Sequence, residues 1–382
     1  MKIKVVQFIS GMNIGGAETI VKNYCLLLDK EKMNLTLLCI HNHHSMYDKE
    51  LKNAGIHVIY ADDEIDKRTI GPKQIKRVFH RMLRPLVLGR ILRDINPDII
   101  HSHLCVNRFI RMAGLNPQTR IVHTVHSEPE ALWKKSCEGR RDMKALQCLG
   151  KQYCVKFIAL HQDMKKQVDR MFGVHDTQVF HNGIDIAAFA DAGEKKALRR
   201  MYRVNEAAFV IGNVASFSPV KNHAFLLDVF YELQKKHPDS FLWLAGDGGG
   251  RNAIQKKARS LGILDKIVFW GKRGDVPQLL KMMDAVCFPS FYEGLSVALI
   301  ESQAAGIPAL VSKEVSRYTK ISNLITFMEL SQGAGKWADR LLEYKQNRPF
   351  PQYTQLEEWD MKNVVKRLER YYERLAAENR AW

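Results

Sequence analysis

Two glutamates bracket an apolar run in the segment FPSFYEGLSVALIESQAAGIP, residues 288–308. Burying ionised Glu293 and Glu301 without partners would be costly, so we expect a polar ligand beside them. The pattern predicts a loop over 289–294, then a helix that begins near Leu295 or Ser296 with Ser296 as its N-cap. The amides and positive end of that helix would bind a negative group, and each carboxylate would accept hydroxyl hydrogen bonds. A phosphate flanked by two hydroxyl-bearing groups describes a nucleotide sugar.

Three other loops follow expected strands. Gly15 and Gly16 in ISGMNIGGAET (9–19) would let the backbone approach an anion at a helix start, although an ordinary tight turn is the alternative. Lys221 in ASFSPVKNH (215–223) could pair a phosphate or be a solvated surface lysine. The third loop is the glycine run AGDGGGR (245–251). Their equivalent positions at strand ends favour one shared site.

Four histidines lie near two strand ends, His101 and His103 in IIHSHL and His123 and His126 in VHTVHS. Side chains alternate along a strand, so His101 and His103 share a face. A zinc site needs three or four ligands, and no Cys or Glu stands at ligand spacing. Hydrogen bonding to a polar substrate is therefore favoured over metal binding.

These residues must be positioned by alternating strands and helices. Continuous apolar strands are expected at 3–10, 34–41, 56–61, 97–103, 120–127 and 156–160, then again at 209–215, 240–248, 266–271, 285–290 and 308–312. This pattern indicates parallel sheets covered on both faces. We expect domains over 1–188 and 189–352 and a final charged helix over 353–382. Ligands bind at the carboxyl ends of the strands in such sheets.

The formal net charge of +17 implies a polyanionic partner. Residues 67–93 are rich in Lys and Arg, lack acidic residues, and carry a helical apolar stripe. That stripe comprises Ile75, Val78, Phe79, Met82 and Leu83. Either it packs on its own domain or the helix lies on an anionic bilayer. Lys76, Arg77, Arg81 and Arg84 are the candidate membrane-binding residues, and His103 is a candidate for acceptor binding.

The sequence disfavours three other classes of protein: membrane-spanning, secreted and nucleic-acid-binding. No long uncharged apolar run predicts a membrane-spanning helix, and the first residues lack the pattern of a secretory signal. Seven cysteines without a CxxC pair indicate reduced thiols in a cytosol. Single-stranded nucleic acid binding would need aromatics interleaved with the basic residues, and segment 67–93 offers only Phe79 on the apolar side.

The chain resembles the retaining GT-B glycosyltransferases, in the large family that includes bacterial lipopolysaccharide, capsule and exopolysaccharide transferases. The resemblance rests on the two glutamates with seven residues between them in EGLSVALIE, on SQAAGIPAL after them, and on NIGGAE, HNGID and SPVKN. It implies an α/β fold of the GT-B type. Two doubly wound, Rossmann-like domains would face a cleft, and the C-terminal helix would cross back to the first domain.

The resemblance also implies roles for individual residues. Glu293 would contact the donor sugar, and His126 would lie near its anomeric centre. Glu301 would hold the ribose. The remaining donor-binding candidates are the diphosphate-facing residues, the residues at the helix start and the nucleobase loop: Gly15, Gly16, Ser216, Lys221, Gly294, Leu295, Ser296, Lys272 and Arg273.

The expected activity is metal-independent, retaining transfer from a nucleotide sugar, with uridine as the base, to a lipid-linked saccharide. We expect a cytoplasmic protein at the inner face of the plasma membrane, without a cofactor and without nucleic acid as a partner. Ser216 stands where the family usually has an arginine that pairs with the diphosphate. A nucleotide-sugar 2-epimerase of the same architecture and a catalytically inactive scaffold of a polysaccharide assembly complex are the alternatives.

Overall fold

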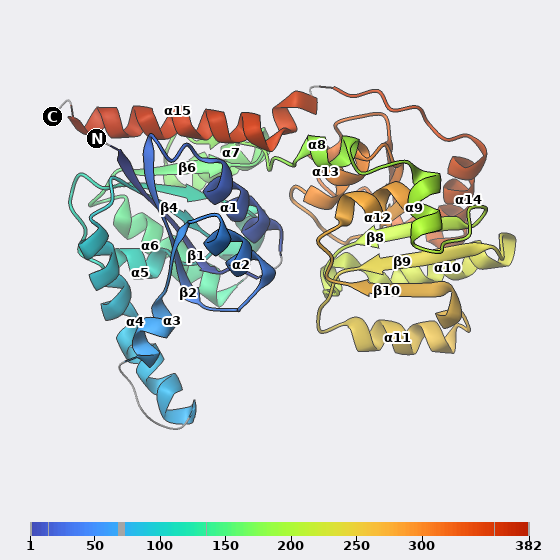
Figure 1. Ribbon diagram of the computed structural model, residues 1–382, viewed down its shortest axis with the longest axis horizontal. Helices are drawn as coiled ribbons and strands as arrows, with labels where there is room; N and C mark the ends of the chain where they lie inside the picture. The colour runs from blue at the N-terminus through green and yellow to red at the C-terminus, as the bar shows by residue number, and fades with distance from the viewer. Residues whose placement is uncertain (1, 14, 68–72, 135, 355, 381–382) are drawn as a thin grey trace. The chain divides into compact units, whose positions relative to one another are not determined.

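The computed structural model describes residues 2–13, 15–67, 73–134, 136–354 and 356–380. At 73–77 and 379–380 it describes the backbone only. The chain forms two compact units, Met1–Gly183 together with Met361–Trp382, and Ile184–Asp360 (Figure 1). Each unit is a parallel sheet covered by helices. The expectation of two doubly wound α/β units is confirmed.

The first unit is built on a seven-stranded sheet in the order β3-β2-β1-β4-β5-β6-β7. The strands are β1 (Ile3–Gly11), β2 (Met33–His41), β3 (His57–Tyr60), β4 (Ile99–His103), β5 (Arg120–Thr124), β6 (Val155–Ala159) and β7 (Gln178–Val179). All neighbouring strands run parallel. Most of their residues are buried, as the continuous apolar runs indicate.

Helices cover both faces of this sheet. They are α1 (Gly16–Leu27), α2 (Met46–Asn53), α3 (Ala61–Asp66), α4 (Lys73–Ile95), α5 (Asn107–Arg111), α6 (Cys137–Leu149), α7 (Gln162–Phe172) and α15 (Met361–Arg380). One core cluster joins the sheet to α1 and α15, and the other joins it to α4 and α5. The final helix α15 thus returns to the first unit (Figure 1). Its residues Val364, Leu368, Tyr372 and Leu375 are buried there.

The second unit has a six-stranded sheet in the order β10-β9-β8-β11-β12-β13. Its strands are β8 (Phe209–Val214), β9 (Ser240–Ala245), β10 (Ile267–Gly271), β11 (Ala285–Phe288), β12 (Ala309–Ser312) and β13 (Ile325–Met328). Its helices are α8 (Ile186–Ala190), α9 (Lys195–Met201), α10 (His223–Lys236), α11 (Arg251–Ser260), α12 (Val276–Met282), α13 (Val297–Ala304) and α14 (Gly333–Gln346). Two edge strands, β7 and β13, were not expected from the sequence.

Close packing between two loops accounts for glycines after β9. A Cβ added at Gly246, whose φ is +137°, would lie 2.0 Å from the carbonyl oxygen of Ala215. A Cβ at Gly250 would lie 2.7 Å from the carbonyl oxygen of Phe217, which accepts a hydrogen bond from the Gly250 amide at 3.0 Å. The glycine run therefore fits the backbone of the β8 loop, besides any contact with a ligand.

Candidate functional site

Loops at the carboxyl edge of the second sheet bring Lys221 and Glu293 together. The Lys221 ammonium donates a hydrogen bond to the Glu293 carboxylate, and the Ser290 hydroxyl donates to the same oxygen at 3.4 Å. Both side chains of the ion pair are largely shielded, with 21% and 13% of their surface exposed. The residues predicted to bind the phosphate and the sugar of one donor are thus direct neighbours.

Local backbone structure places Lys221 in this position. A 3₁₀ turn over Pro219–Lys221 ends at Asn222, which adopts a left-handed conformation with φ of 52° and caps α10 through the Phe225 amide. Asparagine tolerates this conformation better than most residues. The Phe291 amide donates to the Val220 carbonyl at 2.8 Å and joins this turn to the loop that carries Glu293.

Helix α13 begins as expected, but Ser296 differs in detail. It occupies the N-cap position, yet its side chain makes no capping hydrogen bond, so the predicted cap contact is wrong. Leu295 is buried and Gly294 is half-buried beside it. The helix start therefore keeps its first amides without a side-chain cap from Ser296, which leaves room for an anionic group.

Glu301 lies within α13 and differs from the other carboxylates of this unit. Among the described residues it has no hydrogen-bond or ion-pair partner, and burial raises its pKa to about 7. A carboxylate with unused acceptor positions can accept two hydroxyl hydrogen bonds. Glu301 therefore has the chemistry that a vicinal diol, such as that of a ribose, requires.

Unlike Lys221, which pairs with Glu293, the basic residue Arg273 in the loop after β10 pairs with Asp275. Arg273 Nε donates to Asp275 at 2.6 Å, and its guanidinium lies 5.0 Å from the Trp270 ring centroid. Lys272 and Ser216 are exposed. Arg273 is therefore held within its own loop and would have to leave Asp275 to pair with a diphosphate.

In the first unit, Gly15 and Gly16 form the start of α1. Gly15 is the N-cap in an extended conformation, with φ of −161°, so its backbone does not itself require glycine. A Cβ at Gly16 would meet no atom within 4 Å. The space beside this helix start is therefore open in the direction of that Cβ.

The predicted histidine group divides between the two faces of the first sheet. His103 Nδ1 lies 3.0 Å from His126 Nε2, whereas His123 bonds to Ser102 on the opposite side. Burial lowers the pKa of His126 to about 4. In the part of the chain that the structure describes, no group of three or more His, Cys, Asp or Glu side chains could hold a metal ion.

Helix α4 leaves much of its apolar stripe exposed. Within the stripe, the exposed fractions are 59% for Val78, 41% for Phe79 and 67% for Met82, whereas Leu83 is half-buried and the side chain of Ile75 lies outside the described residues. Leu86, one turn after Met82, is 69% exposed and forms the exposed stripe of α4 together with Val78, Phe79 and Met82. The helix packs on its unit through its later turns, where Leu88 and Leu92 are buried, and its earlier turns lie beside α3 (Figure 1). The interpretation that the stripe packs on its own domain is therefore wrong for Val78, Phe79 and Met82.

The basic residues of α4 are not equivalent. Arg84 makes two 2.9 Å hydrogen bonds to Asp62, whereas Arg81 is exposed. The side chains of Lys76 and Arg77 lie outside the described residues. None of the described helices is long and apolar enough to cross a membrane.

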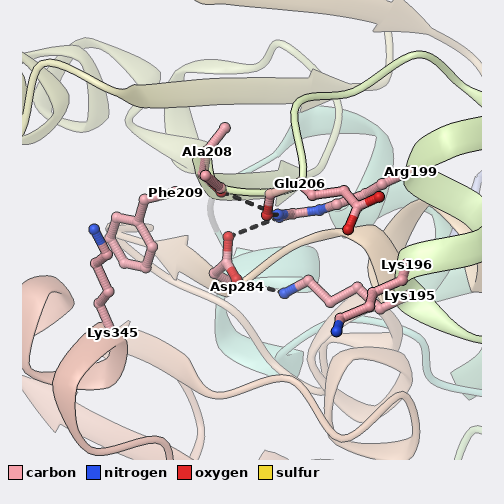
Figure 2. Close-up of a pocket in the computed structure, with 9 residues that line it drawn as sticks. Lys195, Lys196, Arg199, Glu206, Ala208, Phe209, Asp284 and Lys345 are labelled. Carbon is pink, nitrogen blue, oxygen red and sulfur yellow. Dashed lines mark hydrogen bonds and ion pairs between the residues drawn. The ribbon is translucent and has the colours of Figure 1, made fainter.

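A cavity of about 260 Å³ lies in the second unit, away from these loops (Figure 2). Asp284 pairs there with Lys195 and with Arg199, whose Nη2 donates at 2.8 Å. Asp284 and Phe209 stand at the amino ends of β11 and β8. The cavity therefore belongs to the opposite edge of the sheet and not to the candidate site.

Comparison with known proteins shows that both units resemble glycosyltransferases. Residues 194–323 match the family described as Glycosyl transferases group 1, and residues 14–188 match Glycosyltransferase Family 4. EpsF of Bacillus subtilis (strain 168), which bears the name of a glycosyltransferase, is 29% identical over 359 residues, 88% of this chain and 86% of EpsF.

Two further similarities cover most of the chain. The UDP-Gal:alpha-D-GlcNAc-diphosphoundecaprenol alpha-1,3-galactosyltransferase of Escherichia coli is 25% identical over 325 residues, 81% of this chain and 79% of that protein. The crystal structure of HepE of Anabaena, in complex with UDP and glucose, superposes with a TM-score of 0.71 at 16% identity and covers 99% of this chain and 98% of HepE. With both of its units matched by glycosyltransferase models, the chain belongs to the GT-B glycosyltransferases.

Proposed function

We propose that this protein transfers a sugar, with retention of anomeric configuration, from a UDP-sugar to a lipid-linked saccharide in capsule or exopolysaccharide biosynthesis. The observation that carries the proposal is the pairing of Lys221 with Glu293 at the carboxyl edge of the second sheet, next in sequence to α13, the helix that carries the buried carboxylate of Glu301. The E. coli relative, whose name gives UDP-Gal and a diphosphoundecaprenol-linked acceptor, supports the choice of donor and acceptor classes. UDP bound to HepE supports uridine as the base.

In this proposal each group at the edge of the second sheet has one task. Lys221 leaves Glu293 and pairs with the donor diphosphate, and the start of α13 adds its amides to the same charge. Glu293 accepts hydrogen bonds from hydroxyls of the transferred sugar. Glu301 accepts hydrogen bonds from the ribose. Lys221 and the amides at the start of α13 supply the positive charge that the leaving diphosphate needs, so we expect donor binding without a metal ion.

The reaction replaces one bond to the anomeric carbon by another. The acceptor hydroxyl oxygen bonds to the anomeric carbon on the face from which UDP leaves, and the bond from that carbon to the β-phosphate oxygen breaks. The hydroxyl proton passes to the departing phosphate. His126 would lie beside the donor sugar, and its neutral imidazole would contribute hydrogen bonding and not charge.

The exposed stripe of α4 supports contact with a membrane. Val78, Phe79, Met82 and Leu86 would enter the interface, and Arg81 would meet anionic headgroups. A lipid-linked acceptor is presented at such a surface. Arg84 contributes less in this proposal because Asp62 already neutralises its charge.

A transfer assay tests the proposed function. Radiolabelled UDP-galactose and UDP-glucose are incubated with the protein and diphosphoundecaprenol-linked saccharides in EDTA, and lipid-extractable label is counted. We expect transfer from one donor and a loss of at least about 100-fold in turnover for Glu293→Ala, comparable to removing a group that stabilises developing charge. Unchanged turnover in Glu293→Ala would contradict the assigned role.

A further inference from the structure

A chain of hydrogen-bonded side chains inside the first unit links α15 to His126. Gln7 Nε2 donates to Tyr372 Oη at 2.9 Å, and Gln7 Oε1 lies 2.8 Å from His103 Nε2. His103 Nδ1 in turn lies 3.0 Å from His126 Nε2. On the other side of Tyr372 Oη, His101 Nδ1 lies 2.5 Å away. The tyrosine hydroxyl is therefore the junction between two histidine branches.

The register of β1 and β4 places these side chains next to one another. Gln7 on β1 and His101 on β4 are register partners, and His103 lies two residues further along β4 on the same face. Tyr372 reaches that face from α15. Gln7, His101, His103 and Tyr372 are all fully buried, so their polar atoms must bond to one another.

The donors and acceptors in this series of hydrogen bonds can be assigned from Tyr372 to His126. Tyr372 Oη accepts from Gln7, so its single proton goes to His101 Nδ1. Gln7 Oε1 can only accept, so His103 carries its proton on Nε2. Burial and the neighbouring histidines hold the pKa of His103 well below its usual range, and a neutral ring has one proton. His103 Nδ1 therefore accepts the hydrogen bond, and His126 Nε2 donates it.

This series of hydrogen bonds ends at His126 Nδ1. The ring is neutral near pH 7 because burial lowers its pKa, so Nδ1 carries a bare lone pair. Among the described residues this buried atom has no hydrogen-bond partner. An unpaired buried acceptor is costly, and a hydroxyl of a bound sugar would relieve that cost.

We propose that Tyr372 is a positioning residue that acts through Gln7 and His103 to fix His126 as the Nε2–H tautomer, with Nδ1 kept as the acceptor for a hydroxyl of the bound donor sugar. This inference rests on the proposed function, which places His126 beside that sugar. It assigns the returning helix α15 an indirect part in the chemistry, through the buried side chains of the first unit.

Nitrogen-15 spectra of the histidine rings in the full chain without ligand test the tautomer at pH 7.5. A His126→Asn variant assigns the His126 signals. We expect wild-type His126 to be protonated at Nε2, and Tyr372→Phe to move it toward the Nδ1–H form, since Gln7 can then reverse its amide. Tyr371→Phe is the matched control, because its hydroxyl is also buried and makes no hydrogen bond within the described chain. A proton on Nδ1 in the wild type would overturn the inference without any need for the Tyr372 variant.

Release of UDP from UDP-glucose gives a second readout. We expect Tyr372→Phe to lower kcat about tenfold, the effect of one lost hydrogen bond, with KM changed less than about twofold. Tyr371→Phe should match the wild type. Equal losses in both variants would mark a merely structural role and overturn the inference. If the wild type releases no UDP, the proposed function fails, while the ring spectra still decide the tautomer.

Discussion

Replacing Glu301 by Gln should stabilise the unliganded protein at alkaline pH. Burial raises the pKa of Glu301 from 4.5 to about 7. Between those values the folded protein holds a proton on Glu301 that the unfolded chain has released, so the free energy of unfolding falls as pH rises through this window. At 1.36 kcal/mol for each unit of pKa, the full cost above pH 7 is about 3 kcal/mol.

Two considerations set the expected size of the effect. Glu301 keeps part of its surface exposed, so water relieves some of the cost, and we expect about 1–3 kcal/mol at pH 8. For a unit of this size, each kcal/mol raises Tm by about 2–4 °C. Glu301→Gln should therefore raise the Tm of the second unit by about 2–12 °C at pH 8 and have little effect near pH 4.5.

Calorimetric melting from pH 4.5 to 9 measures this difference. Glu314→Gln, a change at an exposed glutamate of the same unit, is the matched control and should leave Tm unchanged at every pH. The same Glu301 variant should lose stabilisation by UDP, because the amide cannot accept two ribose hydroxyls equally well. A stability gain that is equal at pH 5 and pH 8, or no gain at all, would refute the reasoning.

Three further changes follow from the same structure. Replacing the exposed stripe of α4 by Ser at Val78, Phe79, Met82 and Leu86 should abolish flotation with anionic vesicles and leave Tm unchanged, whereas Ser at the exposed Met201 and Phe350 should preserve binding. Gly246→Ala should cost more than about 2 kcal/mol in urea unfolding, because φ is +137° and the Cβ meets Ala215, whereas Gly249→Ala, with open space around it, should be nearly neutral. Burial opposes ionisation of Asp284, but the charges of Lys195 and Arg199 outweigh burial and lower the pKa of Asp284. Ionised Asp284 therefore stabilises the fold above pH 3.8, and this stabilisation is lost as the pH falls below 3.8. Asp284→Asn should cost about 3 kcal/mol at pH 7, against about 0.5 kcal/mol or less for Asp339→Asn in the surface pair with Lys236.

Much of the fold could be predicted from local sequence because buried parallel strands are continuous apolar runs. β1, β2 and β8 are examples, each followed by a turn signal and a helix. The edge strand β7 has only two residues, too few to give a pattern in the sequence. The edge strand β13, with the sequence ITFM, is as short and as apolar as β11 and β12, so the sequence did contain the signal for it.

The candidate site was predictable in its parts but not in its contacts. Loops at equivalent strand ends indicated that Lys221 and Glu293 share an edge, yet nothing in the spacing indicated that they pair directly. His101 and Tyr372 lie 271 residues apart and meet only because α15 returns to the first unit. The exposure of the α4 stripe was equally out of reach, since an apolar face on a helix predicts burial without naming what covers it.

Thermal stabilisation by UDP in EDTA is the most direct test of a metal-independent donor site at the carboxyl edge of the second sheet. At about 100 times its Kd, UDP should add about 2.7 kcal/mol to the wild type, with much smaller shifts from GDP and ADP. Lys221→Ala and Glu301→Gln should each remove most of the UDP shift. No shift with any nucleotide would contradict the account and favour an inactive scaffold, and a UDP shift that survives in both variants would place the donor elsewhere.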